Sequence, residues 1–146
     1  MSIHQLSVFL ENKPGRLSAV CKDLADAGIS ILACCLADTH RYGVFRLIVR
    51  QWEAGRDVLV RDGCIVTVTE VTVLEVPDRP GGLEGVLEVI ERIGINLEYM
   101  YAVVARPDHA AMVAFCFEDP PAAVTALQAE GIAIVDRLPG DGSHET

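Results

Sequence analysis

The sequence has few aromatic residues and few basic ones. Phe, Trp and Tyr make up 5% of its 146 residues, and 12 Lys and Arg stand against 21 Asp and Glu. The resulting formal charge of −9 opposes the neutralisation of phosphates on which nucleic-acid affinity depends. This balance argues against RNA, DNA and anionic membranes as partners.

No apolar run is long enough to cross a bilayer. The longest, Ala110 to Phe117, has eight residues, whereas a membrane-spanning helix needs about 20. The N-terminal segment MSIHQLSVFLENKPG lacks the basic flank, the long apolar segment and the cleavage site of a secretory signal. We therefore expect a soluble, cytoplasmic protein.

Cysteine and histidine do not form the patterns of disulfide frameworks or metal sites. The five cysteines contain no C-x-x-C pair, which favours reduced, mostly buried thiols. The four histidines are scattered without metal-ligand spacing. Walker, G-x-S-x-G, H-E-x-x-H and dinucleotide-binding motifs are also missing. We expect no catalytic residues, no metal and no cofactor.

The strongest feature that is present is an internal repeat. The segment from Leu10 to Leu32 aligns without a gap with the segment from Val76 to Glu98, 66 positions later. A period of 66 residues exceeds the 20–50 residues typical of solenoids and propellers, so each copy is expected to be a small domain. We predict one copy at residues 1–70, a second at 71–138 and a flexible tail at 139–146.

Each copy carries the same succession of expected elements. Apolar alternation, helical periodicity and turn residues predict strand, helix, strand, strand, helix, strand. Strands are expected at 4–10, 29–37, 44–49, 65–69, 71–76, 95–105, 110–117 and 132–135, and helices at 14–27, 53–61, 81–93 and 120–129. This βαββαβ order is typical of the ferredoxin-like fold: an α+β protein with two antiparallel sheets, each with its helices on one face.

The loop before the first helix of each copy, ENKPGRL and PDRPGGL, is the candidate site. A helix N-terminus presents unpaired amides that attract a carboxylate, and glycine lets a ligand approach them. Asn12 and Asp78 offer polar groups for the other end of a zwitterion such as an amino acid. The alternative is purely structural, with Asn or Asp as the N-cap and Pro14 as the first helical residue.

The repeated (Asn/Asp)-x-Pro-Gly-x-Leu loop, followed by G-I-(Ser/Asn), resembles the ACT domains, which are small regulatory modules that bind amino acids. The resemblance covers roughly Ile3 to Arg137 and implies side-by-side pairing with an effector bound between paired copies. It also implies a homodimer and a separately encoded metabolic enzyme as partner. The ligand-binding residues carried over from it are Asn12, Gly15, Arg16, Leu17, Ser30, Ile31, Asp78, Gly81, Gly82, Leu83, Asn96 and Leu97.

Two positions depart from the ACT pattern. Asp78 stands where Asn is common and repels a ligand carboxylate, while Ser30 stands where Asn is common and has a shorter reach. We therefore expect either that the two sites differ in affinity or that one of them is empty. Two rival hypotheses are a ligand-free dimerisation module and an enzyme or redox sensor that uses Cys34, Cys35 or His109.

Overall fold

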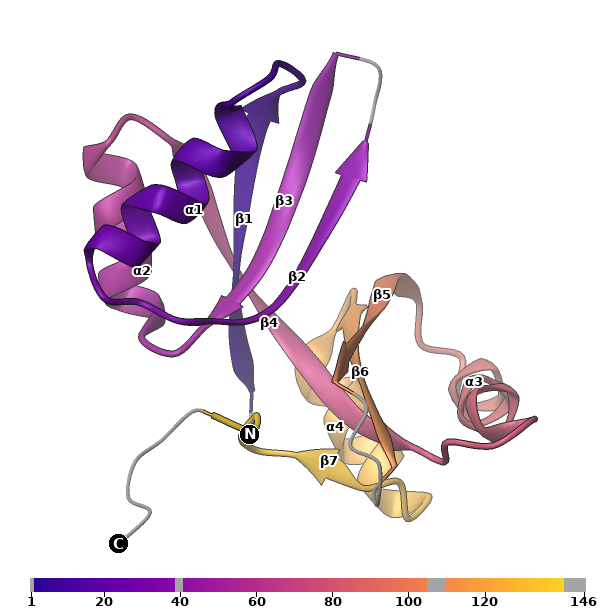
Figure 1. Ribbon diagram of the computed structural model, residues 1–146. Coiled ribbons are helices and arrows are strands. Elements are labelled where there is room, and N and C mark those ends of the chain that lie inside the picture. Colours follow the sequence, from indigo (N-terminus) through magenta and orange to yellow (C-terminus); the bar gives the residue numbers. More distant parts are fainter. Residues whose placement is uncertain (1, 39–40, 105–109, 141–146) are drawn as a thin grey trace, which may run out of the picture. The chain divides into compact units, whose positions relative to one another are not determined.

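The computed structural model describes residues 2–38, 41–104 and 110–140, apart from the side chains of Asp38 and Val104. The chain forms two compact units (Figure 1). The N-terminal unit comprises His4–Thr69 and Leu138–Thr146, and the C-terminal unit comprises Met1–Ile3 and Glu70–Arg137. The predicted boundaries at 70 and 138 stay predictions, and most of the predicted tail lies outside the described residues.

The N-terminal unit is a sheet with two helices. Its elements are β1 (Ile3–Glu11), α1 (Arg16–Asp26), β2 (Ile31–Asp38), β3 (Tyr42–Val49), α2 (Trp52–Arg61) and the beginning of β4 (Ile65–Val76). The strand order is β2-β3-β1-β4, and β3 pairs antiparallel with both β1 and β2. This order is that of a ferredoxin-like domain.

The C-terminal unit repeats this plan. The rest of β4 is followed by α3 (Gly82–Ile93), β5 (Leu97–Val104), β6 (Ala111–Phe117), α4 (Pro120–Ala129) and the short β7 (Ile134–Val135). The strand order is β5-β6-β4-β7, with every pair antiparallel. The predicted α+β class with two βαββαβ repeats is confirmed.

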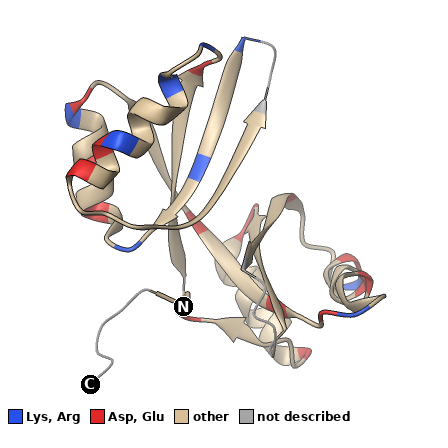
Figure 2. Ribbon diagram, viewed as in Figure 1, with Lys and Arg blue, Asp and Glu red and all other residues tan. Residues whose placement is uncertain are grey.

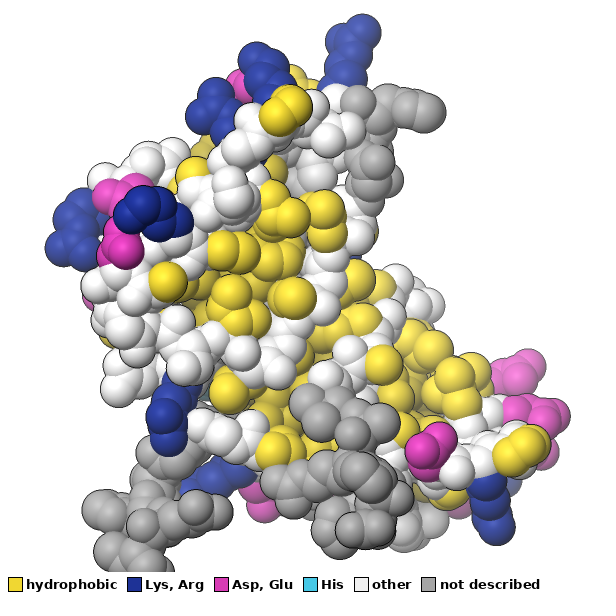
Figure 3. Space-filling view, in the orientation of Figure 1, with side chains coloured by type: hydrophobic (Ala, Val, Ile, Leu, Met, Phe, Trp, Pro, Cys, Tyr) yellow, Lys and Arg dark blue, Asp and Glu magenta, His cyan; other side chains and the backbone are white. Residues whose placement is uncertain are grey.

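The core of the N-terminal unit lies between the sheet and its two helices. Alternate residues of β1 and β3 point to the same face, as the period of a strand requires, and meet the apolar stripes of α1 and α2. The buried members are Leu6, Val8, Val20, Leu24, Ile29, Phe45, Leu47, Val49 and Leu59. Figure 3 shows apolar side chains gathered between α1 and strands β2 and β3.

The C-terminal unit has a core of the same design. Alternate residues of β4 and β6 pack against α3 and α4, and the Phe115 and Phe117 rings lie 5.9 Å apart, centroid to centroid. The buried members are Leu74, Val76, Val86, Ile90, Val113, Phe115, Phe117, Ala123 and Leu127. Each repeat therefore buries its own apolar face.

One strand replaces two that the sequence predicts. The segments 65–69 and 71–76 were expected as separate strands, but β4 runs without interruption from Ile65 to Val76. The stretch TVTEVTVLEV contains no glycine or proline, so nothing in it breaks the extended backbone. Residues 65–69 of this strand belong to the N-terminal unit and residues 70–76 to the C-terminal unit.

The starts of the first helices also differ from the capping prediction. Helix α1 begins at Arg16, not at Pro14, and its N-cap is Gly15 with φ 87°. Helix α3 begins at Gly82, and its N-cap is Gly81 with φ 83°. At the N-terminus of neither helix does a side chain make a capping hydrogen bond, so the interpretation of Asn12 as an N-cap is wrong. The left-handed glycine turns the chain into the helix instead.

The prediction of mostly buried thiols is also wrong. All five cysteines are free, but only Cys116 is buried, and Cys34 is exposed. Cys34 lies on β2, which stands at the end of the strand order and, among the described residues, has a neighbouring strand on one side only. No helix among the described residues is long and apolar enough to span a membrane.

Replacing Gly82 by alanine tests the turn that begins α3. An ideal Cβ at Gly82 lies 1.8 Å from the Pro77 carbonyl oxygen, a distance that forces the backbone to move. We expect Gly82→Ala to lower the free energy of unfolding by about 3 kcal/mol in chemical denaturation.

Gly85→Ala is the matched control, because a Cβ there meets nothing within 4 Å and the residue lies within the same helix. It should raise the stability by about 0.5–1 kcal/mol through helix propensity. Equal effects of the two substitutions would contradict this account of the turn.

Candidate functional site

The loop between β1 and α1 is held by its own backbone. The amide of Lys13 donates to the Glu11 carbonyl at 2.8 Å, and that of Arg16 donates to the Lys13 carbonyl at 3.3 Å. The amide of Asn12 donates to the carbonyl of Arg41, which ties the loop to the start of β3. The next amides of the first helical turn, those of Leu17 and Ser18, have no partner within the helix.

The second repeat builds the same loop. The amide of Arg79 donates to the Pro77 carbonyl at 2.9 Å, and that of Gly82 donates to the Arg79 carbonyl at 2.9 Å. These bonds match those of Lys13 and Arg16, 66 positions earlier. The close approach of the Pro77 carbonyl to Gly82 leaves no room for a side chain there. The second loop therefore has the same backbone hydrogen bonds as the first, with Gly82 in the place of Arg16.

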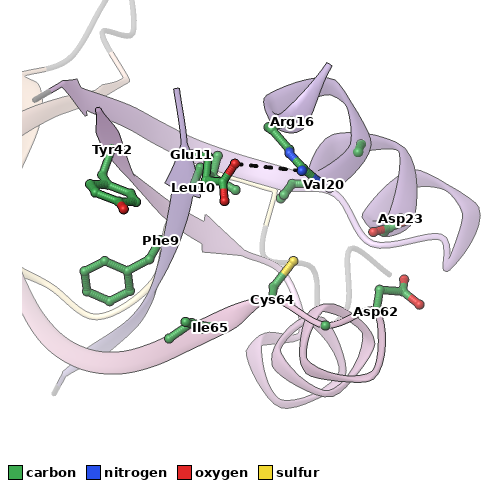
Figure 4. A pocket seen from close by; sticks show the side chains of 12 residues that line it. Phe9, Leu10, Glu11, Arg16, Val20, Asp23, Tyr42, Asp62, Cys64 and Ile65 are labelled. Atoms are coloured by element: carbon green, nitrogen blue, oxygen red, sulfur yellow. Dashed lines mark ion pairs between the residues drawn. The ribbon is translucent and has the colours of Figure 1, made fainter. Parts of the chain in front are cut away.

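Three hollows of the N-terminal unit converge on its loop. The largest, which we call the first-repeat cavity, has a volume of about 380 Å³ and lies between the end of β1, helix α1 and the turn before β4 (Figure 4). Its lining residues are Phe9, Leu10, Glu11, Arg16, Ala19, Val20, Asp23, Tyr42, Asp62, Gly63, Cys64 and Ile65. A volume of this size lies within the range of small-molecule sites.

The other two hollows contain Asn12. A small one of about 90 Å³ is lined by Leu10, Glu11, Asn12, Lys13, Arg16, Leu17, Leu36 and Gly43. A broader one of about 370 Å³ is lined by Glu11, Asn12, Lys13, Arg41 and Tyr42. Glu11 borders all three hollows, and Arg16 borders two of them.

The C-terminal unit has a hollow in the corresponding place. The second-repeat cavity, about 310 Å³, is lined by Glu75, Pro77, Arg79, Gly81, Gly82, Gly85, Val86, Gly131, Ile132 and Ala133. Gly63 and Gly131 occupy equivalent turns in the two repeats. Each glycine comes shortly after the second helix of its repeat, and each has a positive φ. The duplication has therefore kept a cavity as well as a fold.

Charges of both signs gather at the first loop. The Glu11 carboxylate lies 2.9 Å from Lys13 Nζ and 3.9 Å from an Arg16 guanidinium nitrogen. The hydrogen bond and charge of Lys13, followed by the charge of Arg16, lower the pKa of Glu11 from its ordinary value. Figure 2 shows basic and acidic positions close together where β1 leads into α1. The side chains of Glu11, Lys13 and Arg16 are exposed, so their ion pairs contribute little to stability. A charged ligand can therefore replace them at small cost in free energy.

Two carboxylates meet at the other end of the first-repeat cavity. Asp23 of α1 and Asp62, in the turn after α2, share a side-chain hydrogen bond. Desolvation and the Asp62 charge raise the pKa of Asp23 above its ordinary value. Desolvation, with the charges of Asp23 and Asp62, likewise raises the pKa of the Cys64 thiol. This end of the cavity therefore disfavours further negative charge and favours a cation.

The structure brings only some of the predicted site residues together. Asn12, Arg16 and Leu17 line one hollow, and Gly81 and Gly82 line the second-repeat cavity. Gly15 is the exposed N-cap of α1. Asp78 lies in the loop before α3, and Leu83 directly follows Gly82. Both are exposed, and neither is among the residues that line the second-repeat cavity.

Ser30 and Ile31 lie at the far end of their sheet from Asn12. Ile31 pairs with Val49, whereas Glu11, just before Asn12, pairs with Tyr42 at the opposite end of β3. The seven steps between Tyr42 and Val49 span about 23 Å. The expectation that the start of this strand lies near the preceding loop is therefore wrong within the unit.

Asn96 and Leu97 are placed in the same way. Leu97 pairs with Phe117, whereas Val76, at the end of β4 beside the second loop, pairs with Ala111. The cause is the helix between loop and strand, because it carries the chain back along the sheet before the strand begins. Loop and strand start can share a ligand only if they come from different copies.

Sequence reasoning missed the acidic end of the first-repeat cavity. Arg16, Val20 and Asp23 stand at i, i+4 and i+7, a spacing that places them on one face of a helix. The sequence alone could have indicated this shared face. The approach of Asp62 was not readable, because it comes from a turn 39 positions further along. No group of three or more metal-ligating side chains occurs among the described residues.

The paired carboxylates predict a pH dependence of stability. Because the folded-state pKa of Asp23 is raised, its stabilising contribution is complete below the ordinary value of 3.8 and is lost as pH rises through the folded pKa. Asp23→Asn removes this loss. We expect the variant to melt at a higher temperature than the parent at neutral pH and to lose that advantage below pH 3.8.

Asp26→Asn serves as the control, because Asp26 lies on the same helix and pairs with Lys22. Its charge also raises the pKa of Asp23, but less than that of Asp62 does, and its loss breaks the pair with Lys22. The gain at neutral pH should therefore be smaller than for Asp23→Asn. A lower melting temperature for Asp23→Asn at neutral pH would contradict the repulsion that we infer.

Known proteins support the same architecture. Protein BT0572 from Bacteroides thetaiotaomicron has 31% sequence identity and a TM-score of 0.86, with 92% of each chain covered. The regulatory subunit of aspartate kinase from Thermus thermophilus, in its ligand-free form, has 16% identity and a TM-score of 0.60 over 86% of this chain and 90% of that one. Its Thermus flavus counterpart has 16% identity and a TM-score of 0.55, with coverages of 88% and 93%.

No curated protein matches the sequence. The family model described as an ACT domain pair matches residues 1–133, which include the first repeat, the second repeat up to the start of β7, and the lining residues of both cavities. The duplicated βαββαβ fold and the repeated proline-glycine loop agree with that match. The chain belongs to the family of ACT domain pairs.

Proposed function

We propose that the chain is a non-catalytic sensor that binds a free amino acid beside a β1–α1 loop, where ACT copies pair, and thereby modulates an enzyme of amino-acid metabolism. The observation that carries this proposal is the convergence of three hollows on the first loop. That loop offers the Arg16 guanidinium, the Glu11 carboxylate and helix amides within one small region. These groups complement a zwitterion.

Membership of the ACT family and the fold of its neighbours support a regulatory role. Two of the neighbours are regulatory subunits of aspartate kinase, an enzyme that acts on an amino acid. The proposed partner of this chain is likewise a separate enzyme, and the proposed assembly is a homodimer. A bound amino acid regulates such an assembly only if it binds one arrangement of the copies more tightly than another.

A thermal-shift screen against the twenty amino acids tests the proposal. An amino acid present at about 100 times its dissociation constant adds about 2.7 kcal/mol of stability. For a chain of this size, that corresponds to a rise in melting temperature on the order of 5–10 °C. We expect a selective rise with one amino acid or one class of them.

Asn12→Ala and Asp78→Ala, screened in parallel, identify the repeat that binds. Loss of the shift in one variant assigns the ligand to that loop. A flat response of the unmodified protein to all twenty amino acids would contradict the sensor function and favour a ligand-free assembly module.

A further inference from the structure

The first-repeat cavity has two differently charged ends, set by one face of α1. Arg16, Val20 and Asp23 stand on that face at i, i+4 and i+7. Seven residues of helix correspond to about 10 Å along its axis. In Figure 4, Asp23 and Asp62 lie at one side of the cavity, while a dashed line joins Arg16 to Glu11. A ligand that contacts both ends must therefore be elongated.

The acidic end is suited to a cation. Asp23 and Asp62 both line the cavity and are close enough to share a hydrogen bond, so two negative charges there repel each other. The neighbouring Lys22 pairs with Asp26. An ammonium or guanidinium group placed between Asp23 and Asp62 removes the repulsion and makes two charge-assisted hydrogen bonds.

The opposite end is suited to the head of an amino acid. Arg16 presents donors for an α-carboxylate, and Glu11 presents acceptors for an α-ammonium. Their side chains are 59% and 49% exposed and their closest approach is 3.9 Å, so their mutual ion pair is weak. Glu11 also pairs with Lys13 at 2.9 Å, and this pair is exposed as well. A ligand that brings both charges can therefore replace these exposed pairs.

The wall between the two ends is apolar. Val20, which is 2% exposed, lines the cavity together with Leu10 and Cys64. Such a wall accommodates a run of methylene groups, as the stems of long basic side chains do when they lie along apolar surface.

We propose that the first-repeat cavity binds an amino acid with a long basic side chain, with its side-chain cation between Asp23 and Asp62, its carboxylate on Arg16 and its methylene stem along Val20. This inference rests on the proposed sensor function and specifies its ligand class and its site. The four-carbon stem of lysine, together with the reach of the Arg16 and aspartate side chains, matches the separation of the two ends.

The second-repeat cavity is lined by Glu75 and Arg79 but lacks counterparts of Arg16, Glu11 and Asp23. Gly82 stands where the first repeat has Arg16, and the Pro77 carbonyl excludes any side chain there. Pro77 itself stands at the position of Glu11, and Val89 at that of Asp23. Glu130, in the position of Asp62, pairs with Arg92. The ligand therefore binds once per chain, in the first repeat.

Isothermal titration of the full chain with lysine and two truncated analogues tests each end of the cavity. Norleucine keeps the stem and the zwitterionic head but lacks the side-chain ammonium, and cadaverine keeps both ammonium groups but lacks the carboxylate. We expect lysine to bind with one site per chain and each analogue to bind at least about tenfold more weakly. Norleucine binding as tightly as lysine would overturn the role of the acidic end.

Charge-neutral variants locate the site. Asp62→Asn should lower the affinity for lysine about tenfold or more, whereas Asp26→Asn, which removes the same charge from a residue outside the cavity, should leave it unchanged. Because Asp62 is exposed and its loss relieves repulsion, the melting temperature of the variant confirms that it folds. Undiminished lysine binding by Asp62→Asn would overturn the assignment to this cavity.

The screen of twenty amino acids separates failure of this inference from failure of the sensor function. A selective response to a neutral or acidic amino acid, with none to lysine or arginine, overturns the basic-ligand proposal and leaves the sensor function in place. A flat response to all twenty overturns both.

Discussion

The left-handed glycine between the first strand and the first helix of each repeat is the constraint on which the candidate site depends. Gly15 and Gly81, with φ 87° and 83°, turn the chain from strand to helix without a side-chain cap. Because backbone hydrogen bonds hold each loop, its side chains are available for other contacts. The hollows of each unit lie beside this turn, so its geometry positions both the helix amides and the cavity walls.

The two repeats share a backbone plan and differ in the chemistry of their cavities. In the first, Arg16, Glu11, Asp23 and Asp62 surround an apolar wall. In the second, glycine, proline and apolar residues replace most of these groups, and the Pro77 carbonyl occupies the space of a side chain at Gly82. A duplicated fold preserves what its core requires, because core volume and strand register constrain many residues together. The cavity lining is not constrained in this way and differs between the copies.

The thiols have a structural setting that bears on the rival idea of redox chemistry. Desolvation, with the charge of Cys34, raises the pKa of Cys21, and desolvation with two nearby carboxylates raises that of Cys64. Reactive thiols need the opposite setting, because the thiolate is the nucleophile. Cys34 is exposed, and His109 lies outside the described residues. Because its raised pKa keeps the Cys64 thiol neutral, this side chain can line a cavity against an alkyl stem.

The sequence alone determined the duplication, the βαββαβ order and the importance of the Pro-Gly loop, because periodicity and turn residues act over a few neighbouring positions. It also indicated the family, through residues within two short segments. Only the tertiary structure decided that β4 is continuous, that glycine begins each first helix, and that Ser30 lies at the far end of the sheet from Asn12. It also brought Asp62 against Asp23 across 39 positions of chain. Local patterns set the type of each element, whereas the contents of a cavity depend on how distant elements pack.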